Sequence, residues 1–276
     1  MTGTVNQIIK LSYVDGPGAR AAIFLQGCNF NCLYCHNPET IQVCDACGEC
    51  VRACPVGALE KPKEKVLWDG EKCTGCDACI QACQRQSSPK ACHLTPQQVF
   101  AKIGSAARMI RGITLSGGEA TQQCEFATKL FALAKSKGLS TFLDSNGAYD
   151  FEKDKQLLKV TDAVMLDIKA YDLQAHLELT GQPNHLPLRN LSFLGGIDKL
   201  YEVRTVIAQD LPGAQETVAK VSKAIAGFET RYKLIRYRPH GVRGQGLEQL
   251  KPPTDLLMDE LAQIARENGT REVIVL

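Results

Sequence analysis

Eleven of the 13 cysteines in this 276-residue chain fall into three groups of fixed spacing. The first group is spaced C-x3-C-x2-C, whereas the second and third share C-x2-C-x2-C-x3-C and are offset by 29 residues. The chain starts without the basic and apolar segments of a signal peptide and has no run of about 18 apolar residues, so we expect a cytoplasmic protein without a membrane span. In that reducing compartment, cysteines spaced in this way indicate metal binding and not disulfides.

The repeated spacing is that of bacterial ferredoxins with two [4Fe–4S] clusters, in which three neighbouring cysteines bind one cluster and the fourth reaches the other. The expected ligand sets are Cys44, Cys47, Cys50 and Cys83 for one cluster, and Cys73, Cys76, Cys79 and Cys54 for the other. Two zinc sites are the alternative, although zinc sites use paired C-x2-C ligands. Because residues 44–90 show little apolar periodicity, we expect a small ferredoxin-like domain that its clusters hold together. It would be inserted into a larger domain made of residues 1–43 and 91–276.

The first group has a different character, because Cys28, Cys32 and Cys35 supply only three thiolates. A [4Fe–4S] cluster on them would keep one iron open for a small ligand. A zinc site that adds His36 is the alternative. Cys92 and Cys124 match no ligand spacing, and we expect them to be buried thiols.

The rest of the chain alternates between short apolar strands and amphipathic helices. Strands are expected at residues 21–25, 113–115, 141–143, 163–166, 201–207, 234–237 and 272–276, and helices at 96–109, 126–137, 151–160, 217–225 and 256–268. This alternation indicates βα units around a parallel sheet. About six or seven units predict an α/β fold with an open, partial (β/α)6-type barrel, whose chemistry lies where the strands end.

Five sequence motifs lie around the first cysteine group and at the ends of the expected strands. The N-terminal motifs are Asp15-Gly16-Pro17-Gly18 with Arg20, Gln26-Gly27-Cys28, and Tyr34-Cys35-His36-Asn37-Pro38. The other two are Ser116-Gly117-Gly118-Glu119 and Asp144-Ser145-Asn146-Gly147. Together they resemble the motifs of radical SAM activating enzymes of glycyl-radical enzymes, over essentially the whole chain. The last two motifs are most similar to the YjjW-type branch, and the ferredoxin insertion is similar to that of the larger activating enzymes. The resemblance implies an oxidoreductase that reductively cleaves S-adenosylmethionine (SAM). The resulting 5′-deoxyadenosyl radical would abstract a hydrogen from a backbone glycine of a partner enzyme.

The resemblance also implies roles for individual residues. Cys28, Cys32 and Cys35 would hold the SAM-binding cluster, and Asp15 would be an acid near the partner's glycine loop. Asp144 and Asp167, with the carbonyl group of Met165, would hold a monovalent cation near the SAM carboxylate. The remaining candidates for SAM contact are Tyr34, Asn37, Gly117, Gly118, Glu119, Ser145, Asn146, Lys169, Arg204 and His240. The plainer alternatives are a simple turn at Gly117, Gly118 and Asp15, a helix cap at Asp144 and a solvated side chain at Lys169.

Charge and composition bear on the partners. The net charge is only +2 and the charges are mixed in sign, so we expect no nucleic-acid partner. We expect a monomer that works anaerobically, carries three [4Fe–4S] clusters and takes electrons from flavodoxin or ferredoxin. Two other functions remain open: a radical SAM enzyme for a small molecule, and an electron-transfer protein with a zinc module. The latter would hold eight irons instead of about twelve and would not cleave SAM.

Overall fold

The computed structural model describes residues 1–276, apart from the side chain of Gln245. Its main element is a nine-stranded sheet in the order β11-β10-β9-β8-β7-β6-β2-β1-β5. The strands β2 and β6 to β11 run parallel, whereas β1 lies antiparallel to both β2 and β5. The bounds are β1 (Gly3–Ser12), β2 (Arg20–Leu25), β5 (Cys92–Leu94), β6 (Gly112–Gly117), β7 (Ser140–Ser145), β8 (Ala163–Asp167), β9 (Leu200–Ile207), β10 (Arg231–Arg236) and β11 (Glu272–Val275).

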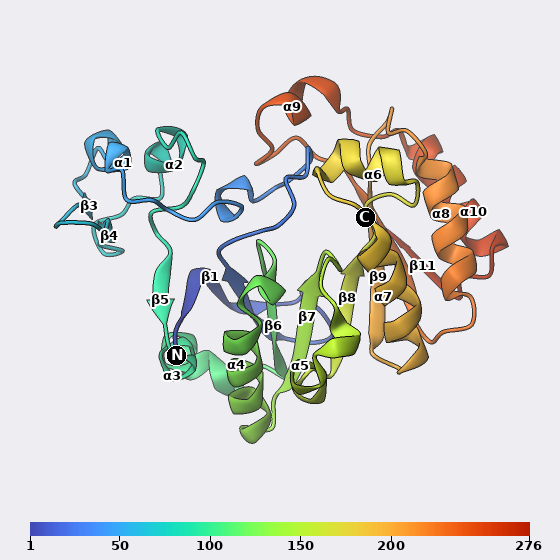
Figure 1. Cartoon of the computed structure of the whole chain (residues 1–276), viewed down its shortest axis with the longest axis horizontal. Helices are drawn as coiled ribbons and strands as arrows, with labels where there is room; N and C mark the ends of the chain where they lie inside the picture. Colours follow the sequence, from blue (N-terminus) through green and yellow to red (C-terminus); the bar gives the residue numbers. More distant parts are fainter.

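Helices connect the strands (Figure 1). They are α3 (Pro96–Ile103), α4 (Cys124–Ser136), α5 (Lys155–Val160), α6 (Leu173–Thr180), α7 (His185–Gly196), α8 (Ala214–Ile225), α9 (Gln245–Gln249) and α10 (Asp255–Glu267). Most of them cover one face of the sheet, whereas α6 and α9 lie beyond the strand ends. The apolar faces of α3, α4, α5, α7, α8 and α10 pack on strand residues such as Leu115, Leu143 and Val203, which are fully buried, whereas α6 belongs to a separate apolar cluster. This burial supplies most of the driving force for the fold.

The sheet curls. This is evident because residues from near its two ends line one cavity of about 1,060 Å³. Asn6 and Gln7 of β1 lie on one side of this cavity, and Ile235 and Arg236 of β10 lie on the other. Within the described residues β1 and β11 do not pair, so the curled sheet has an open seam. A parallel-dominated α/β sheet was predicted from the alternation of strands and helices, and the structure confirms it.

Residues 44–90 lie in a lobe at the side of the sheet, between the loop that follows β2 and strand β5 (Figure 1). The lobe contains only short elements: α1 (Glu49–Ala53), β3 (Leu59–Glu60), β4 (Leu67–Trp68) and α2 (Ala78–Gln81). Its buried apolar residues form a small cluster of Cys50, Leu59, Cys79 and Ile80. So small a cluster provides little stability by itself.

The structure differs from the expected elements in a few places. The helix expected at residues 96–109 ends at Ile103, because Gly104 has a φ of 61° and a short 3-10 helix, Gly104–Arg108, follows. The strands β1 and β5 and the helices α6 and α7 were not expected from the sequence. In α7, Pro187 lies in the first turn, where its missing N–H is tolerated.

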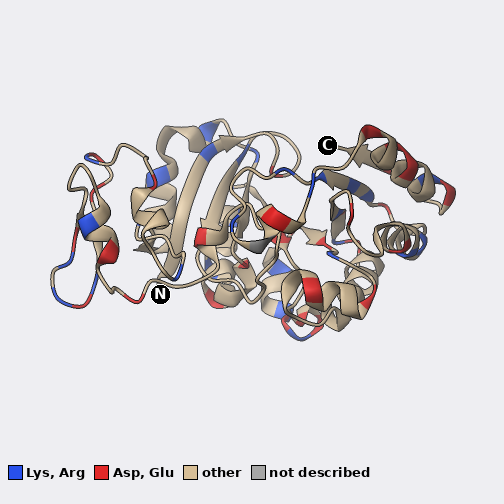
Figure 2. Ribbon diagram, turned by 90° about the horizontal axis from the view of Figure 1, so that it is seen from above, with Lys and Arg blue, Asp and Glu red and all other residues tan. Residues whose placement is uncertain are grey.

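Charged residues of both signs are interspersed over the helices and loops (Figure 2). Among the helices that the structure describes, none combines the length and apolar character needed to cross a bilayer.

Candidate active site

The cysteine loop, residues 26–41, leaves the carboxyl end of β2 and is tied back by backbone hydrogen bonds. Gly27 N–H donates to Thr40 O at 2.7 Å and Cys28 N–H donates to Ile41 O at 3.0 Å. The Leu33 N–H donates to Leu179 O at 2.9 Å, which anchors the loop to α6. Cys28, Cys32 and Cys35 are all half-buried within it. Burial raises the pKa of the Cys28 and Cys32 thiols to about 12, so a metal would have to displace their protons.

The glycines after β6 pack against this loop. A Cβ atom on Gly117 would lie 2.3 Å from Leu25 N, and one on Gly118 would lie 2.2 Å from Gly27 O. Gly118 N–H donates to Leu25 O at 2.9 Å, and Glu119 N–H donates to Gly27 O at 2.8 Å. The two glycines therefore bring β6 close to the backbone that carries Cys28, a packing role that the sequence did not indicate.

Glu119 is a buried carboxylate that joins the ends of β6 and β7. Its Oε1 atom accepts from Thr121 N at 3.1 Å, from Thr121 Oγ1 at 2.6 Å and from Ser145 Oγ at 3.0 Å. Its Oε2 atom accepts from Asn146 N at 2.7 Å. Burial raises the pKa of Glu119, and these hydrogen bonds oppose the rise. The carboxylate thus fixes both the turn after β6 and the turn after β7.

Asn146 extends this arrangement to the cysteine loop. Its Nδ2 atom donates to Asn29 Oδ1 at 2.9 Å and lies 3.8 Å from the Cys28 sulfur. Ser145 and Asn146, both predicted as site residues, therefore reach the cysteine loop through Glu119 and through the Asn146 amide.

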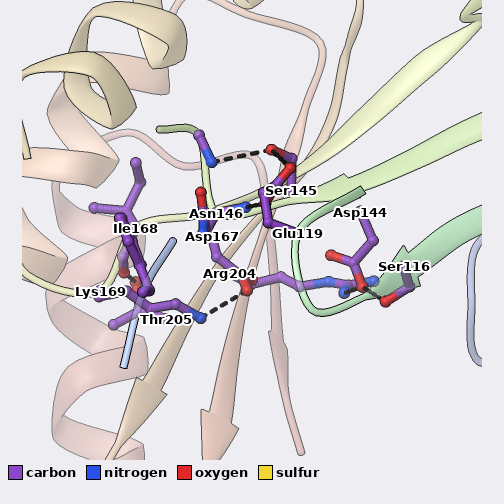
Figure 3. Close-up of polar contacts among 12 residues, drawn as sticks. Ser116, Glu119, Asp144, Ser145, Asn146, Asp167, Ile168, Lys169, Arg204 and Thr205 are labelled. Atoms are coloured by element: carbon purple, nitrogen blue, oxygen red, sulfur yellow. Dashed lines mark hydrogen bonds and ion pairs between the residues drawn. The ribbon is translucent and has the colours of Figure 1, made fainter. Parts of the chain in front are cut away.

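Asp144, Asp167 and Lys169 at the carboxyl ends of β7 and β8 converge with Arg204 from the middle of β9 (Figure 3). Arg204 Nη1 lies 3.0 Å from Asp144 Oδ2, which also accepts from Ser116 Oγ at 3.0 Å. Lys169 Nζ donates to Asp167 Oδ2 at 2.7 Å. Burial raises the pKa of Asp144, although the Arg204 charge opposes the rise. Burial alone would lower the pKa of Lys169, but Asp167 outweighs it and keeps the ammonium charged.

Tyr34 has a polar group that the protein leaves unsatisfied. Its side chain is buried in the cysteine loop, and its hydroxyl lacks a hydrogen-bond partner among the described residues. The Lys169 ammonium lies 5.7 Å from the centre of its ring. A buried hydroxyl without a partner is costly, so this position suits a ligand with a polar group. Lys169 beside this ring and Arg204 in the adjoining group of charges are cations, which suit a carboxylate.

Asn37 and His240 lie at the other side of the cysteine loop, where both line the cavity of about 1,060 Å³. A Cβ atom on Gly241 would lie 2.4 Å from His36 O, so the His240 loop packs directly on the cysteine loop. The structure therefore places both residues beside the cysteines.

The structure places Asp15 away from the cysteine loop. The residue precedes β2, whereas the cysteines follow β2, so the two lie at opposite ends of that strand. The Asp15 carbonyl oxygen accepts from Thr114 Oγ1 at 2.6 Å, and its carboxylate accepts from Ser12 Oγ. The six extended residues of β2 separate the Gly-Pro-Gly turn from the loop that carries Cys28.

In the side lobe, a small cavity is lined by four cysteines from both halves of the sequence repeat. They are Cys54, Cys73, Cys76 and Cys79, and Trp68 and Lys90 line the same cavity. Among the described residues, no three or more His, Cys, Asp or Glu side chains are close enough to share a single metal ion. Cys92 and Cys124 are half-buried against the main core.

Sequence reasoning missed one charged group of the site. Glu202, two residues before Arg204 on β9, is fully buried and pairs with Arg204, Arg231 and Lys233. The Glu-x-Arg spacing could have indicated this pair, because residues i and i+2 of a strand lie on one face.

The family model of the radical SAM superfamily matches residues 22–194. The chain belongs to the radical SAM superfamily. This membership implies a [4Fe–4S] cluster and SAM. The cysteine loop, the unsatisfied Tyr34 hydroxyl and the two cations are in keeping with both.

Two relatives align over most of the chain. A pyruvate formate-lyase-activating enzyme of Streptococcus mutans is 31% identical, over 92% of this chain and 87% of its own length. A (2S)-3-sulfopropanediol sulfolyase activating enzyme of Bilophila wadsworthia is 32% identical, over 87% of this chain and 86% of its own. The structure of a radical SAM methyltransferase from Sphaerobacter thermophilus is similar in fold, with a TM-score of 0.58 and 12% identity over 96% of this chain and 68% of that one. The relatives are activating enzymes of glycyl-radical enzymes, which confirms the predicted enzyme class.

Proposed function

We propose that this radical SAM protein activates a partner glycyl-radical enzyme by removing a hydrogen atom from a backbone glycine. The observation that carries the proposal is the similarity, above 30% identity and over most of the chain, to enzymes named for that activation. When bound, the cluster and SAM supply a 5′-deoxyadenosyl radical after transfer of one electron.

The side chains around the cysteine loop would bind and orient SAM. Cys28, Cys32 and Cys35 would hold three irons of the cluster and leave the fourth open. Lys169 and Arg204 would face the SAM carboxylate, and the Tyr34 hydroxyl would gain a partner. Asn37 and His240 would contact SAM from the cavity side, and Glu119 would hold the two turns that border it. A monovalent cation would lie between Asp144 and Asp167.

The side lobe would be a ferredoxin-like domain, residues 44–90, with two auxiliary [4Fe–4S] clusters. In support of this proposal, Cys54 lines the same cavity as Cys73, Cys76 and Cys79. In two-cluster ferredoxins the fourth cysteine of one repeat likewise binds the cluster held by the first three cysteines of the other. Cys44, Cys47, Cys50 and Cys83 would bind the second auxiliary cluster. The chain would then carry three clusters, belong to the YjjW-type branch, act as a monomer and receive electrons from flavodoxin or ferredoxin.

Asp15 would lie on the path of the partner's loop, away from the cysteines. Its turn borders the inner face of the curled sheet, where Thr114 contacts it. An acidic side chain there can hydrogen-bond the backbone of an entering peptide.

The function is tested by anaerobic EPR spectroscopy of reconstituted, reduced protein that is mixed with SAM and a glycyl-radical enzyme encoded beside it. A doublet from a carbon-centred glycyl radical, with release of 5′-deoxyadenosine, is the expected result. The matched variants are Cys28→Ser, which should abolish cleavage of SAM, and Cys92→Ser, which should leave it intact. Cleavage of SAM without a glycyl signal from any such partner would favour a small-molecule substrate instead.

A further inference from the structure

Glu202 is a charged residue on the inner face of the sheet and has no exposed surface. Its Oε1 atom accepts from Arg204 Nε at 2.6 Å and lies 2.8 Å from Lys233 Nζ. Its Oε2 atom accepts from Arg231 Nε at 2.7 Å. All three partners are cations, and a buried carboxylate with this environment stays ionised. Burial alone would raise the pKa of Glu202, but Arg204 and Lys233 outweigh it and lower the pKa.

Strand register explains why these residues meet. Glu202 and Arg204 alternate on one face of β9, and β10 pairs with β9 so that Arg231 lies beside Glu202 and Lys233 beside Arg204. On the other side of β9, Asp167 of β8 is in register with Arg204. The Arg204 side chain therefore has carboxylates at both ends, because its Nε atom binds Glu202 and its Nη1 atom binds Asp144.

The two contacts fix the direction of the guanidinium. Arg204 extends across the inner face toward Asp144 and Ser116 (Figure 3). Without Glu202, Lys233 and Arg231 would remain beside Arg204 with no anion between them, and their repulsion would displace it.

The whole group has an excess of positive charge. Its cations are Lys169, Arg204, Arg231 and Lys233, and its anions are Asp144, Asp167 and Glu202. One positive charge is left over in a largely buried place, which favours an anionic ligand.

We propose that Glu202 is a positioning residue for SAM, because it holds the Arg204 guanidinium in the orientation that receives the SAM carboxylate. The inference rests on the proposed SAM-binding role of Arg204. It assigns to Glu202 no contact with SAM and no part in the chemical step.

The test is the dissociation constant of SAM for the anaerobically reconstituted holoenzyme, measured by calorimetric titration. Glu202→Gln should weaken SAM binding about tenfold, which corresponds to about 1.4 kcal/mol. Glu202→Asp keeps the negative charge among the cations, so the protein should still fold. Its shorter side chain withdraws the carboxylate from Arg204, so SAM binding should again weaken. Glu229→Gln, a change of an exposed carboxylate just before β10, is the matched control and should leave the dissociation constant unchanged.

A double-mutant cycle separates positioning from general stability. On an Arg204→Gln background, Glu202→Gln should change SAM affinity by less than twofold, because the residue that it positions is gone. The Michaelis constant for SAM should rise in Glu202→Gln while the rate at saturating SAM stays within about twofold.

Three results would overturn the proposal. They are unchanged SAM affinity in Glu202→Asp, a full tenfold effect of Glu202→Gln in the absence of Arg204, or a lower melting temperature with unaltered SAM affinity. If Glu202→Gln does not fold, Glu202→Asp decides alone. Failure of the proposed activation would show as SAM binding without a glycyl radical, and it would leave these affinity comparisons unaffected.

Discussion

Replacement of Glu119 by Gln should destabilise the protein through one specific atom. In the wild type, Glu119 Oε2 accepts from the buried Asn146 N–H at 2.7 Å, while Oε1 accepts from Thr121 and Ser145. A glutamine that keeps its oxygen at the Oε1 position turns an NH2 group toward the Asn146 N–H, so two donors face each other. The flipped amide is worse, because it faces the Thr121 N–H.

The magnitude follows from that lost contact. A hydrogen bond to a charged group contributes about 1.5–3 kcal/mol. In a chain of this size, about 2 kcal/mol lowers the melting temperature by about 3–4 °C. The Asn146 amide, which reaches Asn29 and the Cys28 sulfur, would also lose its fixed position.

The assay is anaerobic calorimetric unfolding of the reconstituted protein at one scan rate, because melting of such a protein is expected to be irreversible. Glu125→Gln is the control, since Glu125 is an exposed acid in the first turn of the next helix, α4. Its melting temperature should change by about 1 °C or less. Equal melting temperatures for wild type and Glu119→Gln, or an equal loss in Glu125→Gln, would refute the reasoning.

Three further perturbations test other parts of the structure. Gly118→Ala places a methyl group 2.2 Å from Gly27 O and should reduce iron incorporation at the cysteine loop, whereas Gly196→Ala, which meets nothing within 4 Å, should leave the iron content per chain unchanged. Cys54→Ser should remove about four irons per chain and increase the fluorescence of Trp68, the one tryptophan, because both line the same cavity; unaltered iron and fluorescence would contradict the ligand assignment. In the metal-free protein, burial raises the pKa of Cys28 to about 12, so the thiol stays protonated at pH 8 and its alkylation should accelerate up to and beyond pH 10. Mass spectrometry should find Cys28 at least tenfold slower to alkylate at pH 8 than the exposed Cys76, and equal rates would show that the loop is open.

Much of the sheet could be predicted from the sequence, because its parallel strands are short apolar runs that each end at a polar motif. Ser116, Asp144 and Asp167 follow or end such runs, and parallel strands bring their carboxyl ends to one edge. The convergence of these residues with Arg204 therefore follows from a pattern that local sequence shows.

The remaining features depend on contacts that local sequence does not encode. In β1, Gln7 borders a cavity and Lys10 also interrupts the apolar residues, so the periodicity of this strand is weak. From local sequence alone, Glu202 is expected to be a solvated strand residue. Only the register of β9 and β10 shows that two further cations lie beside it. The packing of Gly118 on Gly27 likewise joins residues 91 positions apart.

The open seam between β1 and β11 has a consequence for what kind of molecule can reach the inner face of the sheet. A polypeptide loop is attached to its own protein at both ends, so it cannot be threaded through a closed ring. A slot along the side removes this topological barrier, since a loop can enter sideways and leave by the same route. If the substrate is a loop of a folded protein, as proposed, the gap between the sheet's ends offers it a sideways entrance to the inner face.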